Sequence, residues 1–124
     1  MRQIAGQRYL NLESFRRDGQ GVKTPLWFAA DPAEPDRFYV YSTADSFKVK
    51  RIRRNAQVRI AACTMRGHLL GDWMDARAEI VSGAEAAHAM ALLDRKYFPW
   101  KQLIGLFARL RGHQRAVIRI SAAA

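Results

Sequence analysis

The sequence predicts an α+β protein built around a mainly antiparallel barrel of six strands. Short segments rich in aromatic and β-branched residues are separated by turns that contain glycine, proline and aspartate. A basic segment and a later apolar segment have helical spacing instead. The predicted order is β-β-β-α-β-β-α-α-β. Strands joined by hairpins, with few helices between them, favour an antiparallel barrel.

The first three strands are predicted within residues 7–43. Apolar residues flank a turn at residues 18–21, where glycines tolerate a positive φ. Pro25 places the second strand at an edge or a bulge, because proline has no N–H for a neighbouring strand. The exposed backbone there could bond a ligand ring, although an ordinary edge strand is the simpler interpretation. A second turn is predicted at residues 31–36, and residues 37–43 form the third strand.

A strongly basic helix is predicted to run to about Arg54, with Asp45 or Ser46 as its N-cap. Val49 and Ile52 are three residues apart, so they share a face and can pack inward. Five cationic residues point in other directions: Lys48, Lys50, Arg51, Arg53 and Arg54. Like charges this close repel one another, which favours an anionic partner.

The fourth and fifth strands are predicted at residues 57–65 and 73–83, where the residues on the two faces alternate. One face of each strand collects the apolar residues Val58, Ile60, Ala62, Met74, Ala76, Ala78 and Ile80. Helical spacing follows at residues 84–98 and, after a proline, at residues 100–112, whose apolar stripe we interpret as core or dimer contact. Residues 115–120 form the last predicted strand.

The length of 124 residues, with 49% apolar and 26% charged residues, predicts one domain, residues 1–124, with one core. No run of about 18 apolar residues is present, so no membrane span is expected. The N-terminus is too polar for a secretory signal peptide. The single cysteine, Cys63, excludes an intrachain disulfide and favours the reducing cytoplasm.

The net charge of +10, from 21 basic and 11 acidic residues, favours anionic partners. Double-stranded DNA would require a helix-turn-helix or zipper context, whereas strands flank the basic helix. A membrane surface would require a broader apolar face. A phosphate group suits the helix N-terminus, where free N–H groups, Lys48 and Arg51 would meet. A solvated helix without a ligand and a nucleic-acid site remain open alternatives.

Other kinds of site have little support in the sequence. The three histidines, His68, His88 and His113, are far apart and lack ligand-like partners, so no metal site is expected. Cys63 lies in an apolar strand, and we interpret it as a buried, inert thiol. No glycine pattern for a phosphate loop or a dinucleotide is present. No catalytic residue is assigned.

Three segments together resemble the pyridoxamine 5'-phosphate oxidase-like, FMN-binding split-barrel superfamily: YLNLESFRRDGQGVKTPLWF, YVYSTADSFKVKRIRRNAQVRIAAC and GHLLGDWMDARAEIV. The sequence is most similar to its small oxidoreductases that depend on the deazaflavin coenzyme F420, and LDRKYFPWKQLIGLFARLRG fits the tail of that branch. The resemblance covers nearly the whole chain. It implies a six-stranded split barrel that forms a homodimer with two cofactor sites at the subunit interface.

The resemblance also implies which residues hold the cofactor. Lys48 and Arg51 would bind its phosphate, with help from Ser46 and Lys50. Thr43 would end the strand beneath the phosphate. The ring system would be lined by Thr24, Pro25 and Trp27.

By this resemblance we expect a cytoplasmic oxidoreductase that uses F420 for hydride transfer to an unknown organic acceptor. The phosphodiester and oligoglutamate tail make F420 more anionic than FMN, which suits Lys50, Arg53, Arg54 and the high net charge. FMN, FAD or haem in the same fold would instead give a flavin reductase, an oxidase or a cofactor carrier. A nucleic-acid-binding module without catalysis is the alternative from another class.

Overall fold

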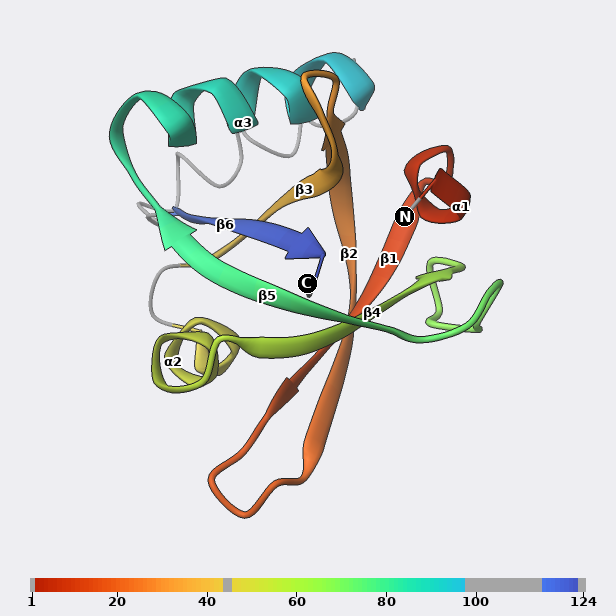
Figure 1. The fold of residues 1–124 in the computed structure, drawn as a ribbon, viewed down its shortest axis with the longest axis vertical. Coiled ribbons are helices and arrows are strands. Elements are labelled where there is room, and N and C mark those ends of the chain that lie inside the picture. The colour runs from red at the N-terminus through yellow and green to blue at the C-terminus, as the bar shows by residue number, and fades with distance from the viewer. Residues whose placement is uncertain (1, 44–45, 98–114, 123–124) are drawn as a thin grey trace.

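The computed structural model describes residues 2–43, 46–97 and 115–122, and Figure 1 shows their arrangement. The helices in this part of the chain are α1 (Arg2–Ala5), α2 (Phe47–Arg54) and α3 (Gly83–Lys96). The strands are β1 (Tyr9–Phe15), β2 (Gly21–Asp31), β3 (Glu34–Thr43), β4 (Gln57–Cys63), β5 (Met74–Val81) and β6 (Arg115–Ala122).

The six strands close into a barrel in the order β1-β2-β3-β6-β5-β4, and every neighbouring pair is antiparallel. This confirms the predicted α+β fold with a mainly antiparallel six-stranded barrel. The β1–β2 hairpin extends below the rest of the barrel in Figure 1. Its turn contains Gly19 with a φ of 88°, a conformation that glycine adopts without strain.

Alternate residues of each strand fill the interior of the barrel. Leu10 and Leu12 of β1 are 0% and 1% exposed, and Phe38 and Val40 of β3 are both fully buried. The apolar residues predicted to share one face of β4 and β5 all lie in or against this core. Full burial of each such large side chain contributes about 1.5–3 kcal/mol.

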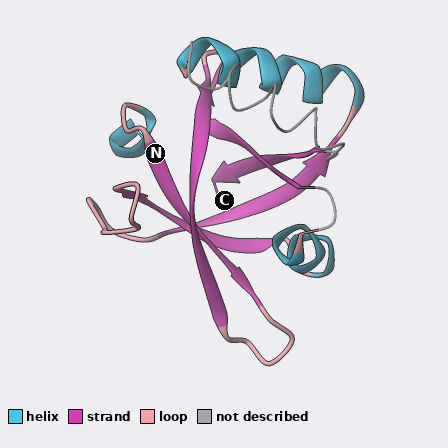
Figure 2. Ribbon diagram, turned by 180° about the vertical axis from the view of Figure 1, so that it is seen from behind, coloured by secondary structure: helices cyan, strands magenta, loops and turns pink. Residues whose placement is uncertain are grey.

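The helices α2 and α3 attach to the barrel in different ways. Val49 and Ile52 of α2 are buried within the barrel core, as their spacing predicted. α3 lies against the outside of the sheet, where Leu93 packs on Ala29 and Ala89 packs on Tyr39. Figures 1 and 2 show α3 at the top of both views and α2 well below it.

The barrel is split between β2 and β3. β2 pairs with β1 from Gly21 to Trp27, but it pairs with β3 only from Phe28 to Asp31. In the described residues, the first part of β2 therefore has a neighbouring strand on one side only. Pro25 lies in this part, which confirms its predicted edge position.

The structure differs from the sequence prediction at some boundaries. α1 was not expected, because four residues carry too little helical periodicity to be recognised. β3 begins at Glu34, since the second turn is shortened by Asp31, whose Oδ1 accepts the N–H of Ala33 at 3.0 Å. The helix predicted at residues 100–112 lies outside the described residues. None of the described helices is long and apolar enough to cross a membrane.

Candidate functional site

Ser46 fixes the start of α2 at the opening of the barrel. Its backbone is extended, and its Oγ accepts the N–H of Val49 at 3.3 Å, so it is the N-cap. Of the two predicted caps, Asp45 lies outside the described residues. Because Val49 and Ile52 anchor one face of α2 in the core, the basic side chains are held on its other faces.

Lys48 and Arg51 of α2 each donate a hydrogen bond to a serine from the barrel. The Lys48 Nζ lies 3.1 Å from the Ser42 Oγ, which is 3.2 Å from the Ser46 Oγ. The Arg51 Nε lies 2.8 Å from the Ser14 Oγ, and Ser14 is 1% exposed. We call these five residues the Lys48–Arg51 cluster. Among the described residues, only the Nε of Arg51 is used in a hydrogen bond, so its two terminal NH₂ groups could bind an anion.

No carboxylate of the described residues forms an ion pair with the cations of this cluster, Lys48 and Arg51. Burial lowers the pKa of Lys48, and repulsion by Arg51 lowers it further. Burial likewise lowers the pKa of Arg51, together with repulsion by Arg16 and Arg54. An anion bound between Lys48 and Arg51 would offset both effects.

The one-sided part of β2 supplies backbone groups next to the split. The N–H and C=O of Phe28 both lie within hydrogen-bond distance of the Tyr97 hydroxyl, beside the end of β1. Because backbone groups alternate along a strand, the N–H of Trp27 and the C=O of Pro25 point to the opposite edge, on the β3 side. The pairing of Phe28 with Val40 places the Trp27 C=O opposite Tyr41 of β3. The Trp27 N–H and the Pro25 C=O are of a kind that can bond the polar edge of a ring, so the roles predicted for these two residues stay predictions.

Three predicted site residues remain. They belong neither to the Lys48–Arg51 cluster nor to the backbone groups of Pro25 and Trp27. Thr24 is half-buried and pairs with Leu12 in the β1–β2 ladder. Lys50 is exposed, and its ammonium lies 5.3 Å from the centre of the Phe47 ring rather than beside the serines. Thr43 ends β3 as expected, but its side chain lies outside the described residues.

Sequence reasoning did not assign three residues that the structure brings to this site. Ser14 and Ser42 continue the inward-facing rows of β1 and β3, and a serine in such a row is a signal that could have been used. Tyr97 had no comparable signal, because it reaches Phe28 across 69 residues of sequence.

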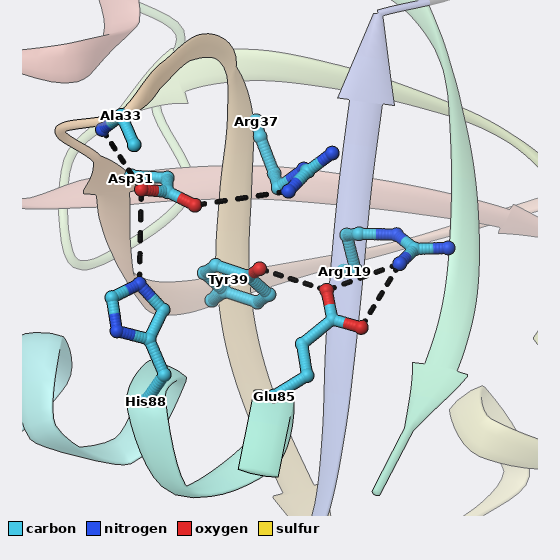
Figure 3. Close-up of polar contacts among 7 residues, drawn as sticks. All are labelled: Asp31, Ala33, Arg37, Tyr39, Glu85, His88 and Arg119. Carbon is cyan, nitrogen blue, oxygen red and sulfur yellow. Dashed lines mark hydrogen bonds and ion pairs between the residues drawn. The ribbon is translucent and has the colours of Figure 1, made fainter.

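A second group of charged side chains lies between α3 and the barrel, and Figure 3 shows its contacts. The Glu85 carboxylate accepts the Tyr39 hydroxyl at 2.8 Å and the Arg119 Nη1 at 3.0 Å. Burial alone would raise the pKa of Glu85, but the hydrogen bonds from Tyr39 and Arg119 outweigh it and lower the pKa. We call this group the α3 cluster; it comprises Asp31, Arg37, Tyr39, Glu79, Glu85, His88 and Arg119.

Asp31 is the other centre of the α3 cluster. It is 5% exposed, and its carboxylate lies 3.9 Å from the Arg37 Nη1 and 3.7 Å from the His88 Nε2 (Figure 3). The carboxylate of Asp31 thus lies between an arginine and a histidine side chain. Within residues 2–43, 46–97 and 115–122, no group of three or more histidine, cysteine, aspartate or glutamate side chains is placed to hold a metal ion.

Solved structures with similar folds include proteins whose descriptions name haem, F420 or FAD. The haem storage protein HutZ from Vibrio cholerae has a TM-score of 0.73 at 13% identity, covering 99% of this chain and 87% of that one. An F420 reductase has a TM-score of 0.61 at 18% identity, covering 98% and 92%. An FAD-binding protein from Mesorhizobium loti has a TM-score of 0.63 at 19% identity, covering 99% and 85%. At these identities the similarity shows the fold alone.

Family membership follows from the sequence as a whole. No curated protein matches the chain significantly. The family model described as pyridoxamine 5'-phosphate oxidase, however, matches residues 1–124. The chain therefore belongs to the pyridoxamine 5'-phosphate oxidase family.

Proposed function

We propose that the protein is an oxidoreductase that binds coenzyme F420 at the split of the barrel and serves hydride transfer to a small organic acceptor. The observation that carries this proposal is the pair of half-buried cations, Lys48 and Arg51, which are held by serine hydroxyls and have no carboxylate partner among the described residues. A cofactor phosphate between them would gain charge-assisted hydrogen bonds and offset their repulsion. FMN has a similar phosphate and is the alternative cofactor.

Positive charge beyond the Lys48–Arg51 cluster favours F420 over FMN. Arg16 and Arg54 both act on the pKa of Arg51, and the Arg54 Nη2 is held at 3.0 Å by a backbone carbonyl of β1. Lys50 and Arg53 are exposed on the same helix. A ligand with an anionic tail would pair with these side chains, whereas FMN has no group to offer them.

The chain's own contribution would be binding, orientation and exclusion of water. Lys48 and Arg51 would hold the phosphate, while Ser14 and Ser42 fix the directions of their side chains. The backbone of Trp27 and Pro25 would hold the polar edge of the ring. When bound, the deazaflavin supplies hydride chemistry. A reducing cytoplasmic setting is consistent with Cys63 being the single cysteine.

A homodimer with the cofactor at the subunit interface is part of the same proposal. Several large apolar side chains are exposed, among them Phe47 at 75%, Met65 at 67% and Leu70 at 56%. A second copy could cover such side chains. Sedimentation equilibrium tests this part, and a monomer at tens of micromolar protein would contradict it.

Removal of both cations tests the site directly. We expect Lys48→Ala combined with Arg51→Ala to weaken F420 binding by at least about a hundredfold, because two charge-assisted contacts are lost. Fluorescence titration with F420, and separately with FMN, measures the affinities. The matched control, Arg66→Ala with Arg95→Ala, removes the same net charge from exposed positions and should bind as the wild type does.

The outcomes separate the alternatives. Unchanged cofactor affinity in the Lys48→Ala/Arg51→Ala variant would reject the site. Tighter binding of FMN, FAD or haem than of F420 would keep the site and replace the cofactor. Binding to unrelated DNA that is lost at moderate salt, without affinity for any cofactor, would instead indicate a nucleic-acid-binding module.

A further inference from the structure

Tyr97 directly follows the last residue of α3. It contacts the barrel at the point where the β1–β2 ladder stops. The last pair of this ladder is Tyr9 with Trp27. One residue further, the Tyr97 hydroxyl accepts the N–H of Phe28 at 2.9 Å. The same hydroxyl lies 2.6 Å from the C=O of Arg8 and 2.8 Å from the C=O of Phe28, so it can donate its proton to either. The hydroxyl thus takes the place of the next ladder contact.

The ring of Tyr97 also supports the side chain of Trp27. The two rings are stacked, with centres 4.7 Å apart and an angle of 11° between their planes. Tyr97 is itself 6% exposed and packs with Leu93 and Ala29, which join α3 to β2. Burial raises the pKa of Tyr97, so its hydroxyl stays protonated at neutral pH.

These contacts act on the edge of β2 that faces the split. Phe28 and Trp27 are adjacent, and their backbone groups point to opposite edges of the strand. Holding Phe28 on the β1 side therefore fixes where the N–H of Trp27 lies on the split side. The Tyr97 ring at the same time stacks on the Trp27 indole, so the residue that follows α3 constrains both the backbone and the side chain of Trp27.

We propose that Tyr97 is a positioning residue for the ring of the redox cofactor, acting through Phe28 and Trp27 rather than by touching the phosphate. This inference rests on the proposed function, because it assumes that the ring binds along the split edge of β2. In this proposal the site has two parts, and different residues hold each part in place. The serines hold the phosphate-binding cations, and Tyr97 holds the ring-binding edge.

The test is Tyr97→Phe, which keeps the stacked ring and removes only the hydroxyl. The matched control is Tyr39→Phe, because Tyr39 is equally buried and its hydroxyl also joins the barrel to α3, through Glu85. We expect Tyr97→Phe to lower the affinity for F420 or FMN by about tenfold, the usual effect of one buried hydrogen bond, and to leave the affinity for inorganic phosphate unchanged. Tyr39→Phe should change neither affinity.

Amide exchange of cofactor-free protein, followed by NMR, tests the ladder contact without any cofactor. The Phe28 amide should be protected in the wild type and in Tyr39→Phe, and should exchange faster in Tyr97→Phe. If Tyr97→Phe failed to fold, the Phe28 amide of the wild type would still decide, since an amide without an acceptor exchanges freely.

Three results would overturn the inference. The first is equal protection of the Phe28 amide in Tyr97→Phe and the wild type. The second is unchanged cofactor affinity in Tyr97→Phe. The third is an equal loss of cofactor and phosphate affinity, which would indicate general loosening. Full cofactor affinity in Lys48→Ala/Arg51→Ala would instead reject the proposed function, while the Phe28 amide would still report whether Tyr97 completes the ladder.

Discussion

The α3 cluster and the Lys48–Arg51 cluster both gather cations against the barrel, but their partners differ. In the α3 cluster, Arg119 is held by Glu85 and Glu79 at 3.0 and 2.8 Å. In the Lys48–Arg51 cluster, the partners are serine hydroxyls at 3.1 and 2.8 Å. The pKa values respond in opposite directions. Burial alone would lower the pKa of Arg119, but its carboxylates outweigh it and raise the pKa, whereas the pKa of Arg51 is lowered.

This difference separates cations that are paired within the fold from cations that, in the described residues, have no carboxylate partner. A charge partly removed from water is unfavourable unless an opposite charge compensates for it. The α3 cluster contains carboxylates that compensate Arg119, so its role is to dock α3 on β3 and β6. The Lys48–Arg51 cluster has no such carboxylate among the described residues, and this is why we propose that it binds an anion.

The largest expected effect on stability is the loss of Glu85. We expect Glu85→Ala to lower the free energy of unfolding by about 2 kcal/mol, because the Tyr39 hydroxyl and Arg119 lose a shared acceptor. Urea denaturation measures it. The control Glu79→Ala removes a carboxylate that is 52% exposed from the same arginine, and it should cost less than about 0.5 kcal/mol. Equal losses of unfolding free energy in Glu85→Ala and Glu79→Ala would contradict the structural role assigned to the α3 cluster.

Glu85 also predicts a pH dependence. The folded-state pKa of Glu85 lies below its ordinary value of 4.5, so its contribution to stability is present above that pH. We expect the stability advantage of the wild type over Glu85→Gln to shrink as the pH falls below 4.5. Denaturation midpoints at a series of pH values measure this, and an advantage that grew on acidification would contradict the sign.

The second effect is stabilisation of the Lys48–Arg51 cluster by an anion. We expect phosphate at ten times its dissociation constant to raise the free energy of unfolding by about 1.4 kcal/mol. Thermal unfolding in phosphate, compared with chloride at equal ionic strength, measures it. Arg66→Ala/Arg95→Ala should respond as the wild type does. A full response of Lys48→Ala/Arg51→Ala would show that phosphate binds elsewhere.

A smaller effect, of opposite sign to that of Glu85→Ala, is expected for Lys48→Met without any anion. Because burial and Arg51 disfavour the charged form of Lys48, we expect the variant to be as stable as the wild type or more stable by up to about 1 kcal/mol. Denaturation in a buffer free of phosphate and sulfate measures it. A loss comparable to that of Glu85→Ala would mean that the Lys48–Ser42 contact maintains the fold.

A further effect, confined to alkaline pH, concerns Lys96, which in the described residues is held by neither a carboxylate nor a hydroxyl. Its Nζ donates to the Gln7 C=O at 2.8 Å and lies 3.6 Å from the centre of the Phe28 ring. Desolvation lowers its pKa from 10.5 to about 8, so the folded protein releases this proton first. Stability should therefore rise from about pH 8 to 10.5 in the wild type relative to Lys96→Met. Parallel pH profiles would contradict this.

Much of the local structure could be predicted because it depends on residues that are close in sequence. Alternating apolar residues predicted β4 and β5, and the three-residue spacing of Val49 and Ile52 predicted the buried face of α2. Ser46 as N-cap and Pro25 at an edge follow from what these side chains do to their own backbone. The cations of the candidate site were assigned on the same grounds and by family resemblance.

By itself, the sequence determined the strands, the capped basic helix and an excess of positive charge without a matching run of acidic residues. Only the tertiary structure decided that Arg51 meets Ser14 across 37 residues, that Tyr97 meets Phe28 across 69, and that β2 pairs with β3 only from Phe28 onward. The physical reason is that closing the barrel brings together strands that are far apart in the sequence. Such contacts leave no pattern in the local sequence. The same closure pairs Arg119 with carboxylates and, in the part of the chain that the structure describes, gives Lys48 and Arg51 serine hydroxyls instead.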